Sequence, residues 1–188
     1  MDPATPESGA GAGPLVALLR SAGALLQRIP RHRAWIPVGL WMGLISASSS
    51  APGRRSGGSL WWAYVANLAH APLFGLLGLW MALLLPRERG WPRIDRRGAP
   101  LVLGGVAAFG IFDELHQLLV AGRDFSVLDL TTDVTAGACV LWVAAHAGQP
   151  EASQRELCGR LLLCTGLCLA VAALSTSLPG FFPGVGWM

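Results

Sequence analysis

The chain has 188 residues, of which 53% are hydrophobic and 13% are charged, and its formal net charge is +3. Soluble domains carry about 25% charged residues on average, so this composition argues against a soluble protein. We expect one integral membrane domain, an all-α polytopic transmembrane helical bundle. The arginines show no basic aromatic stripe, so nothing in the sequence indicates nucleic-acid binding.

The first 33 residues precede the apolar part of the chain. Residues 1–13 are small, polar and rich in Pro and Gly, and we expect a disordered tail there. Residues 14–33 form an amphipathic, basic juxtamembrane segment in which apolar residues recur at helical spacing. Such a helix could lie along the membrane surface or pack on other protein, and the pattern leaves both alternatives open.

Apolar runs predict about five membrane-spanning helices within a membrane domain of residues 34–178. These runs cover about residues 34–50, 60–85, 99–120, 125–145 and 157–177. The first run also resembles a signal peptide, because it has a basic flank and ends in small residues. It begins only at Ala34, however, which favours an uncleaved helix. The aromatic, proline-containing residues 179–188 suit a tail at the membrane interface.

Arginines are divided unequally between alternate loops. One side receives Arg20, Arg28, Arg31, Arg33, Arg87, Arg89, Arg93, Arg96, Arg97, Arg155 and Arg160, and the other receives Arg54, Arg55 and Arg123. The positive-inside rule therefore predicts a cytoplasmic N-terminus and, with five spans, an external C-terminus. The short loops at residues 51–59 and 121–124 would then face the exterior.

The four cysteines lie within apolar helical runs and form no CxxC motif. Cysteine is a small and often buried hydrophobic residue, so we interpret them as packing residues. They are Cys139, Cys158, Cys164 and Cys168.

The segment 112–137 places acidic residues between two strongly apolar runs. It holds five of the eleven acidic residues of the chain, namely Asp113, Glu114, Asp124, Asp129 and Asp133. Ionisable side chains inside a membrane are costly, so they face the protein interior and usually mark a functional site.

Helical spacing gathers these polar residues at one depth of the predicted bundle. Asp113, His116 and Gln117 share one face of the third span, and Asp129 and Asp133 share a face of the fourth. Because the two spans are joined by a very short turn, both sets fall in the outer half of the membrane. His70 in the second span lies at a compatible level, and Ser48, Ser49 and Ser50 end the first span. We therefore predict an outer-leaflet polar pocket.

Arg123 is the expected counter-charge of this pocket, since a guanidinium can hold a carboxylate through two hydrogen bonds. A purely structural interpretation stays open, because polar residues also tie transmembrane helices together and cap helix ends. The acids and His116 offer oxygen and nitrogen ligands, but no motif fixes a metal geometry, and we expect no metal or other cofactor.

The order of these residues resembles the VanZ-like family of small bacterial membrane proteins. The resemblance covers about residues 34–145 and rests on a serine pair, a histidine, a DE-x-x-Q motif, a Gly-Arg turn and a following aspartate. The matching residues are Ser48, Ser49, His70, Asp113, Glu114, Gln117, Gly122, Arg123 and Asp129.

The chain departs from the VanZ-like pattern at three positions. Asn67 stands where the family commonly has Lys, Phe74 where it has Tyr, and Asp133 where it has Asn. These differences remove one cation and add one carboxylate, so they predict a more acidic pocket than in relatives. The small-residue packing pattern behind Asp133 is also shifted, to Ala136 and Gly137.

The resemblance implies a multi-pass protein of the bacterial cytoplasmic membrane with a role at the cell envelope. The family is named for a protein linked to resistance to teicoplanin-type glycopeptides. We expect partners among membrane lipids, with a lipid headgroup or a cell-wall-related ligand in the pocket. The alternatives are a membrane enzyme that uses His70, Asp113 or Glu114 as general acid or base on a lipid-linked substrate, and a structural polar cluster in a membrane scaffold. Proton-coupled transport is disfavoured because the sequence shows no internal repeats.

Overall fold

A computed structural model describes residues 13–51, 59–121, 123 and 125–178. The predicted tails, apart from Gly13, lie outside these residues, as do Arg54, Arg55, Gly122 and Asp124. The elements are α1 (Pro14–Leu26), the 3-10 turn η1 (Arg31–Arg33), α2 (Trp35–Ser49), α3 (Leu60–Ala82), β1 (Arg87–Glu88), β2 (Trp91–Pro92), α4 (Gly98–Gln117), α5 (Val127–Ala147) and α6 (Gln154–Ser177).

The predicted all-α bundle is confirmed. Within the described residues, α3, α4, α5 and α6 are long and apolar enough to cross a membrane. The first predicted span forms α2, which has 15 residues. A helix of that length rises about 22 Å, less than the ~30 Å of a hydrocarbon core. The structure therefore gives four helices of spanning length and a shorter fifth helix that packs beside α3 and α4.

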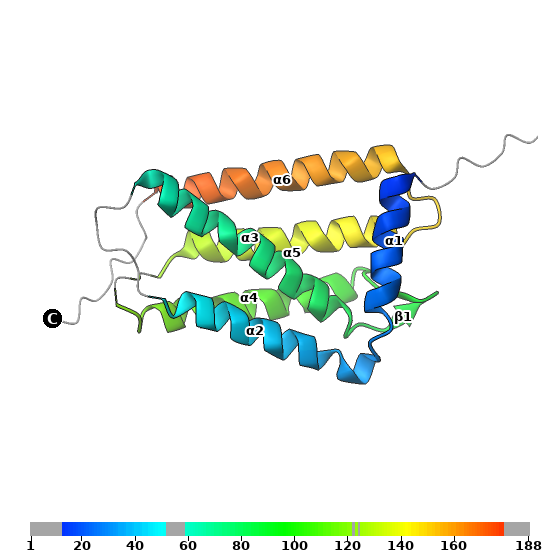
Figure 1. The fold of residues 1–188 in the computed structure, drawn as a ribbon, viewed down its shortest axis with the longest axis horizontal. Coiled ribbons are helices and arrows are strands. Elements are labelled where there is room, and N and C mark those ends of the chain that lie inside the picture. Colours follow the sequence, from blue (N-terminus) through cyan, green and yellow to red (C-terminus); the bar gives the residue numbers. More distant parts are fainter. Residues whose placement is uncertain (1–12, 52–58, 122, 124, 179–188) are drawn as a thin grey trace, which may run out of the picture.

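Helices α2 to α6 run along the long axis of the molecule, and α1 lies across one end (Figure 1). The antiparallel hairpin β1–β2 lies at the same end as α1. Val16 of α1 is buried with Ala152 and Leu157, and the Leu15 N–H donates to Gln154 Oε1 at 3.0 Å. Thus α1 packs on the end of the bundle, beside α5 and α6.

The core of the bundle is built around α3. Phe74 and Leu77 are fully buried and pack with Ile45 of α2 and Val106 of α4. A Cβ added at Gly78 would lie 3.3 Å from the Cα of Gly137 in α5. Small residues allow this close backbone approach, which is a common way of packing membrane helices.

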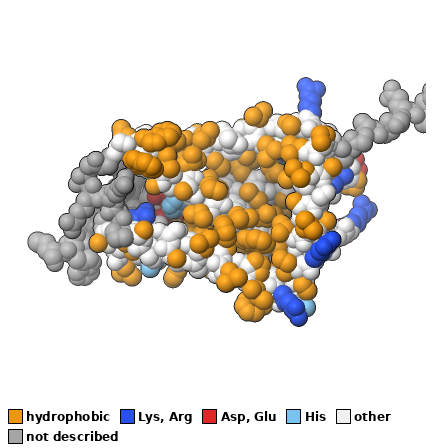
Figure 2. All heavy atoms as spheres, viewed as in Figure 1, with side chains coloured by type: hydrophobic (Ala, Val, Ile, Leu, Met, Phe, Trp, Pro, Cys, Tyr) orange, Lys and Arg blue, Asp and Glu red, His pale blue; other side chains and the backbone are white. Residues whose placement is uncertain are grey.

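Basic side chains gather mainly at the α1 end of the molecule (Figure 2). Among the described arginines, Arg123 alone belongs to the opposite end, where α4 ends and α5 begins. This distribution is the one that the positive-inside rule associates with a cytoplasmic α1 end.

Candidate functional site

Two adjacent acids lie in the last turns of α4, and both are buried. Asp113 is 1% exposed and Glu114 is 0% exposed. The Ser49 hydroxyl at the end of α2 donates to Asp113 Oδ2 at 2.9 Å, and the Gln117 amide donates to the same oxygen at 2.9 Å. Gln117 lies one turn after Asp113, so the predicted common face places its amide on the carboxylate. Asp113 therefore joins α2 to α4.

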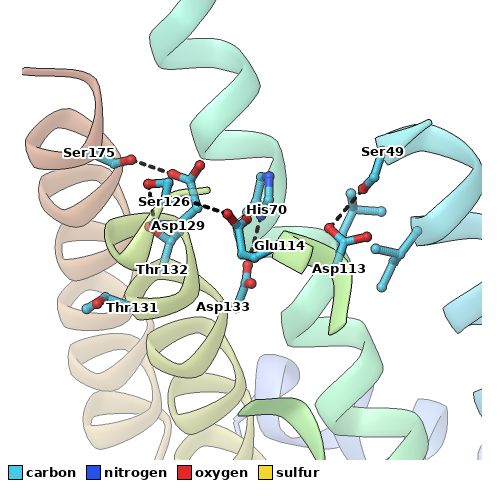
Figure 3. A network of polar contacts seen from close by, with 12 residues as sticks. Ser49, His70, Asp113, Glu114, Ser126, Asp129, Thr131, Thr132, Asp133 and Ser175 are labelled. Carbon is cyan, nitrogen blue, oxygen red and sulfur yellow. Dashed lines mark hydrogen bonds and ion pairs between the residues drawn. The ribbon is translucent and has the colours of Figure 1, made fainter. Parts of the chain in front are cut away.

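Glu114 connects the end of α4 to the start of α5. The Ser126 N–H donates to Glu114 Oε2 at 2.6 Å, and the Gln117 amide lies 3.4 Å from Oε1. Ser126 is also the N-cap of α5, because its hydroxyl accepts the Asp129 N–H at 3.1 Å. The Ser175 hydroxyl of α6 in turn donates to Asp129 Oδ1. A continuous set of hydrogen bonds thus links α2, α4, α5 and α6 (Figure 3).

A histidine–aspartate pair joins α3 to α5. His70 Nδ1 lies 2.9 Å from Asp133 Oδ1, so Nδ1–H can donate to the carboxylate. The Asp133 side chain is 1% exposed, whereas that of His70 is 13% exposed. The other ring nitrogen of His70 points away from Asp133 (Figure 3). His70 is therefore the titratable side chain of this pair that a ligand can reach.

Two carboxylate oxygens of the cluster are buried without a hydrogen-bond partner among the described residues. They are Asp113 Oδ1 and Asp133 Oδ2. A Cβ built on Gly110 of α4 would lie 3.0 Å from Asp133 Oδ2, so this oxygen faces the backbone of α4. Buried polar groups are usually paired, and an unpaired carboxylate oxygen calls for a proton, a water or a ligand.

The remaining sequence candidates lie at the rim of the network. The Ser48 hydroxyl donates to the Ile45 carbonyl of its own helix at 2.7 Å and does not reach the acids. A second contact between the end of α2 and α4 joins Ser50 Oγ and His116 Nε2, which lie 2.9 Å apart. Arg123 Nε is 3.4 Å from the Ala51 carbonyl.

The ion pair expected between Arg123 and an acid is not formed in the described part of the chain. The physical reason is that Asp113, Glu114 and Asp133 are buried inside the bundle, whereas Arg123 lies in the connection between α4 and α5. The guanidinium lies instead at the surface, against the end of α2.

Sequence reasoning named Ser49 but missed two other serines of the network, Ser126 and Ser175. Ser126 had a usable signal, since a serine three residues before an acid is a common start of a helix. Ser175 had none, because a hydroxyl in an apolar α6 becomes a partner of Asp129 only through the packing of two distant helices.

No group of three or more His, Cys, Asp or Glu residues within the described segments is arranged to hold a metal ion. The four cysteines are free thiols, and Cys139 and Cys164 are buried.

The arrangement supports two kinds of chemistry. Asp113, Glu114, Asp129 and Asp133 make an acceptor-rich end of the bundle, which suits amine or hydroxyl groups. The His70–Asp133 pair has the geometry in which a carboxylate orients an imidazole for proton transfer.

Comparison with known proteins identifies a family for this chain. The family model described as VanZ/LLP1 matches residues 18–148. That range includes α2 to α5 and every acid of the buried network. No curated protein and no solved structure matches the chain. The chain therefore belongs to the VanZ/LLP1 family.

Proposed function

We propose that this membrane protein binds the polar headgroup of an envelope lipid, or a cell-wall-related ligand, at the acidic end of its bundle. The observation that carries this proposal is the buried Asp133 Oδ2, which has no partner among the described residues and belongs to the pair whose imidazole is partly exposed. A cluster that served only to join helices would satisfy its acceptors, because each buried unsatisfied group destabilises the fold.

The charge of the cluster indicates which headgroups fit. The cluster contains the carboxyl groups of Asp113, Glu114, Asp129 and Asp133. The imidazole of His70 contacts that of Asp133. Carboxylates accept hydrogen bonds and repel anions, so the favoured ligand presents an amine or several hydroxyl groups.

We place the acidic end at the outer face of the bacterial cytoplasmic membrane. The support is the gathering of arginines at the opposite, α1 end. In this orientation the cluster would face molecules of the cell envelope, and the teicoplanin-type resistance for which the VanZ-like family is named is one process in which we propose that it acts.

Complementation of a deletion strain tests this proposal. We expect wild-type protein to restore teicoplanin susceptibility and envelope lipid composition to their normal values, and Asp133→Asn to fail at equal protein levels. Asp95→Asn is the matched control, because Asp95 is an acid in the loop before α4, at the α1 end. Full complementation by Asp133→Asn would contradict a role for the cluster in ligand binding.

A second candidate function is a membrane enzyme that uses acid–base catalysis on a lipid-linked substrate. The supporting observation is the His70–Asp133 pair, in which Asp133 orients a partly accessible imidazole. Asp113 and Glu114, the other sequence candidates, are enclosed by protein donors and suit a supporting role.

Turnover in proteoliposomes separates the two functions. For an enzyme, His70→Gln should lower turnover of an added lipid-linked substrate by about 100-fold or more, as expected for loss of a general acid or base. For a binding protein, the same variant should change ligand retention, and wild-type protein should leave the lipid unaltered.

A third outcome would favour the structural alternative. If Asp133→Asn, His70→Gln and Glu114→Gln all fail to accumulate in the membrane, the cluster serves to join α2 to α6.

A further inference from the structure

A wedge-shaped groove separates α3 from α6 on one face of the bundle. The two helices lie close together near the start of α3 and diverge toward the α1 end, with α5 behind them (Figure 1). The space between them has a volume of about 570 Å³ and is bounded at its wide end by α1 and by Trp91 of the hairpin. The same face is hollowed between rows of apolar side chains in Figure 2.

The groove is lined almost wholly by apolar side chains. Gln27 at its wide end and Thr165 on α6 are the hydrogen-bonding side chains of its walls besides Trp91 and the cysteines. Its walls belong to helices long and apolar enough to span a membrane. A groove of this composition at membrane depth matches a hydrocarbon chain, because polar groups cannot be satisfied there.

The groove continues into the acidic cluster along α5. Asp133 is followed on the same helical face by the lining residues Ala136 and Val140, at spacings of three and seven residues. Ala71, the residue after His70, also lines the groove on α3. The His70–Asp133 pair therefore lies beside the lining residues Ala71 and Ala136 at the narrow end of the groove.

On helix α6, too, groove-lining residues and a residue of the acidic cluster share one helical face. The lining residue Cys168 is followed seven residues later, on the same face, by Ser175, which donates to Asp129. Toward the acidic end from the groove, the Asn67 side-chain amide of α3 donates to the Thr176 hydroxyl of α6 at 3.1 Å. This hydrogen bond joins the two helices. All three groove helices thus carry polar residues at the acidic end and mostly apolar groove-lining residues toward α1.

We propose that the groove holds the hydrocarbon tail of a membrane lipid whose amine-bearing headgroup lies at His70 and Asp133. This inference rests on the proposed function and names its ligand as one amphiphile that occupies both regions. The position of the partly exposed His70 next to the lining residue Ala71 favours a lipid over a second protein helix, because an apolar helix would leave Asp133 Oδ2 without a partner.

Photo-crosslinking tests the tail site. Full-length protein is reconstituted in vesicles that contain phosphatidylethanolamine with a diazirine in its acyl chain, and labelled residues are mapped by mass spectrometry. We expect the half-buried groove residues Val140 and Leu161 to be labelled about tenfold more than Leu162 and Leu163, which are exposed on the outer surface of α6. Equal labelling of both sets would mean bulk lipid contact and would overturn the proposal.

Two variants of α6 form a matched pair. Cys168→Trp fills the groove and should reduce groove labelling about tenfold, whereas Leu167→Trp, at an exposed position that does not line the groove, should leave it unchanged. If Cys168→Trp does not accumulate, the smaller Cys168→Leu gives the same comparison. Unchanged labelling in the groove-filling variant would overturn the tail site.

A comparison of two lipids with different headgroups, in the same crosslinking assay, separates this inference from the proposed function. Labelling by phosphatidylethanolamine should exceed labelling by phosphatidic acid, which lacks an amine, and Asp133→Asn should remove the difference. If the groove is labelled equally by both lipids, the link between tail and headgroup is wrong. The complementation assay then decides the proposed function by itself.

Discussion

Glu114 provides the sharpest test of how the acidic cluster is built. In Glu114→Ala, the Ser126 N–H loses its acceptor at 2.6 Å, and a fully buried side chain is removed. Leaving a buried donor unpaired costs about 1–3 kcal/mol in soluble proteins, whereas hydrogen bonds inside membrane proteins average about 0.6 kcal/mol. With the added cavity, we expect the free energy of unfolding to fall by about 2–3 kcal/mol.

Glu114→Gln separates hydrogen bonding from charge. The amide oxygen of Gln can still accept the Ser126 N–H, so the expected loss is about 1 kcal/mol or less. Glu151→Ala is the control for an exposed acid and should change stability by less than about 0.5 kcal/mol.

The assay is unfolding in mixed micelles of mild detergent and dodecyl sulfate, followed by tryptophan fluorescence. The eight tryptophans of the chain supply the signal. If Glu114→Gln loses as much stability as Glu114→Ala, the hydrogen bond to Ser126 does not explain the burial of this acid. If neither variant loses stability, Glu114 does not hold α4 to α5.

Three further predictions concern the fold around the site. Gly78→Leu should lower the free energy of unfolding by about 1–3 kcal/mol through overpacking against α5, whereas Gly166→Leu, where an added Cβ meets nothing within 4 Å, should not. Arg87→Ala removes two hydrogen bonds to the carbonyls that follow α1, and faster hydrogen exchange of residues 27–33 should report this. The Gly98 and neighbouring backbone N–H groups lower the pKa of Asp95 to about 2, so its contribution to stability is complete above about pH 4 and is lost as the pH falls toward 2. Thermal unfolding should therefore show a difference between wild type and Asp95→Ala at pH 6 that disappears near pH 2.

Much of the bundle follows from local patterns in the sequence. Apolar runs identify the four long helices to within a few residues, and helical spacing places Asp113 and Gln117 on one face, where the structure shows them bonded. The length of α2 was less predictable. Its apolar run extends from Ala34 to Ser50, but η1 and the turn after Ser49 leave 15 residues in the helix.

Partners across helices could not be derived from the sequence. Asp129 and Asp133 share a face of α5, yet Asp129 meets Ser175 of α6 and Asp133 meets His70 of α3. Which neighbour each acid meets depends on the rotation and tilt of three helices, and no local signal encodes these. The same argument explains Arg123, whose charge suggested an ion pair that the packing does not form.

The three departures from the VanZ-like pattern lie around one residue, His70. Phe74 stacks on its ring with 5.8 Å between centroids and 3° between planes, Asp133 is its hydrogen-bond partner, and Asn67 precedes it by one turn. By contrast, Asp113, Glu114 and Gln117 keep the pattern and are buried among protein donors.

This contrast divides the cluster into two parts with different tasks. The part that keeps the VanZ-like pattern joins helices, and burial leaves it little room to contact a ligand. The positions that depart from the pattern surround the partly exposed imidazole of His70, which itself matches the pattern and lies beside the apolar groove. A change of headgroup alters the charge required beside His70 but not the hydrogen bonds that hold α2 to α6 together. If the proposed function holds, ligand selection in this chain depends on His70, Asp133 and their neighbours, and the DE-x-x-Q residues form the scaffold that positions them.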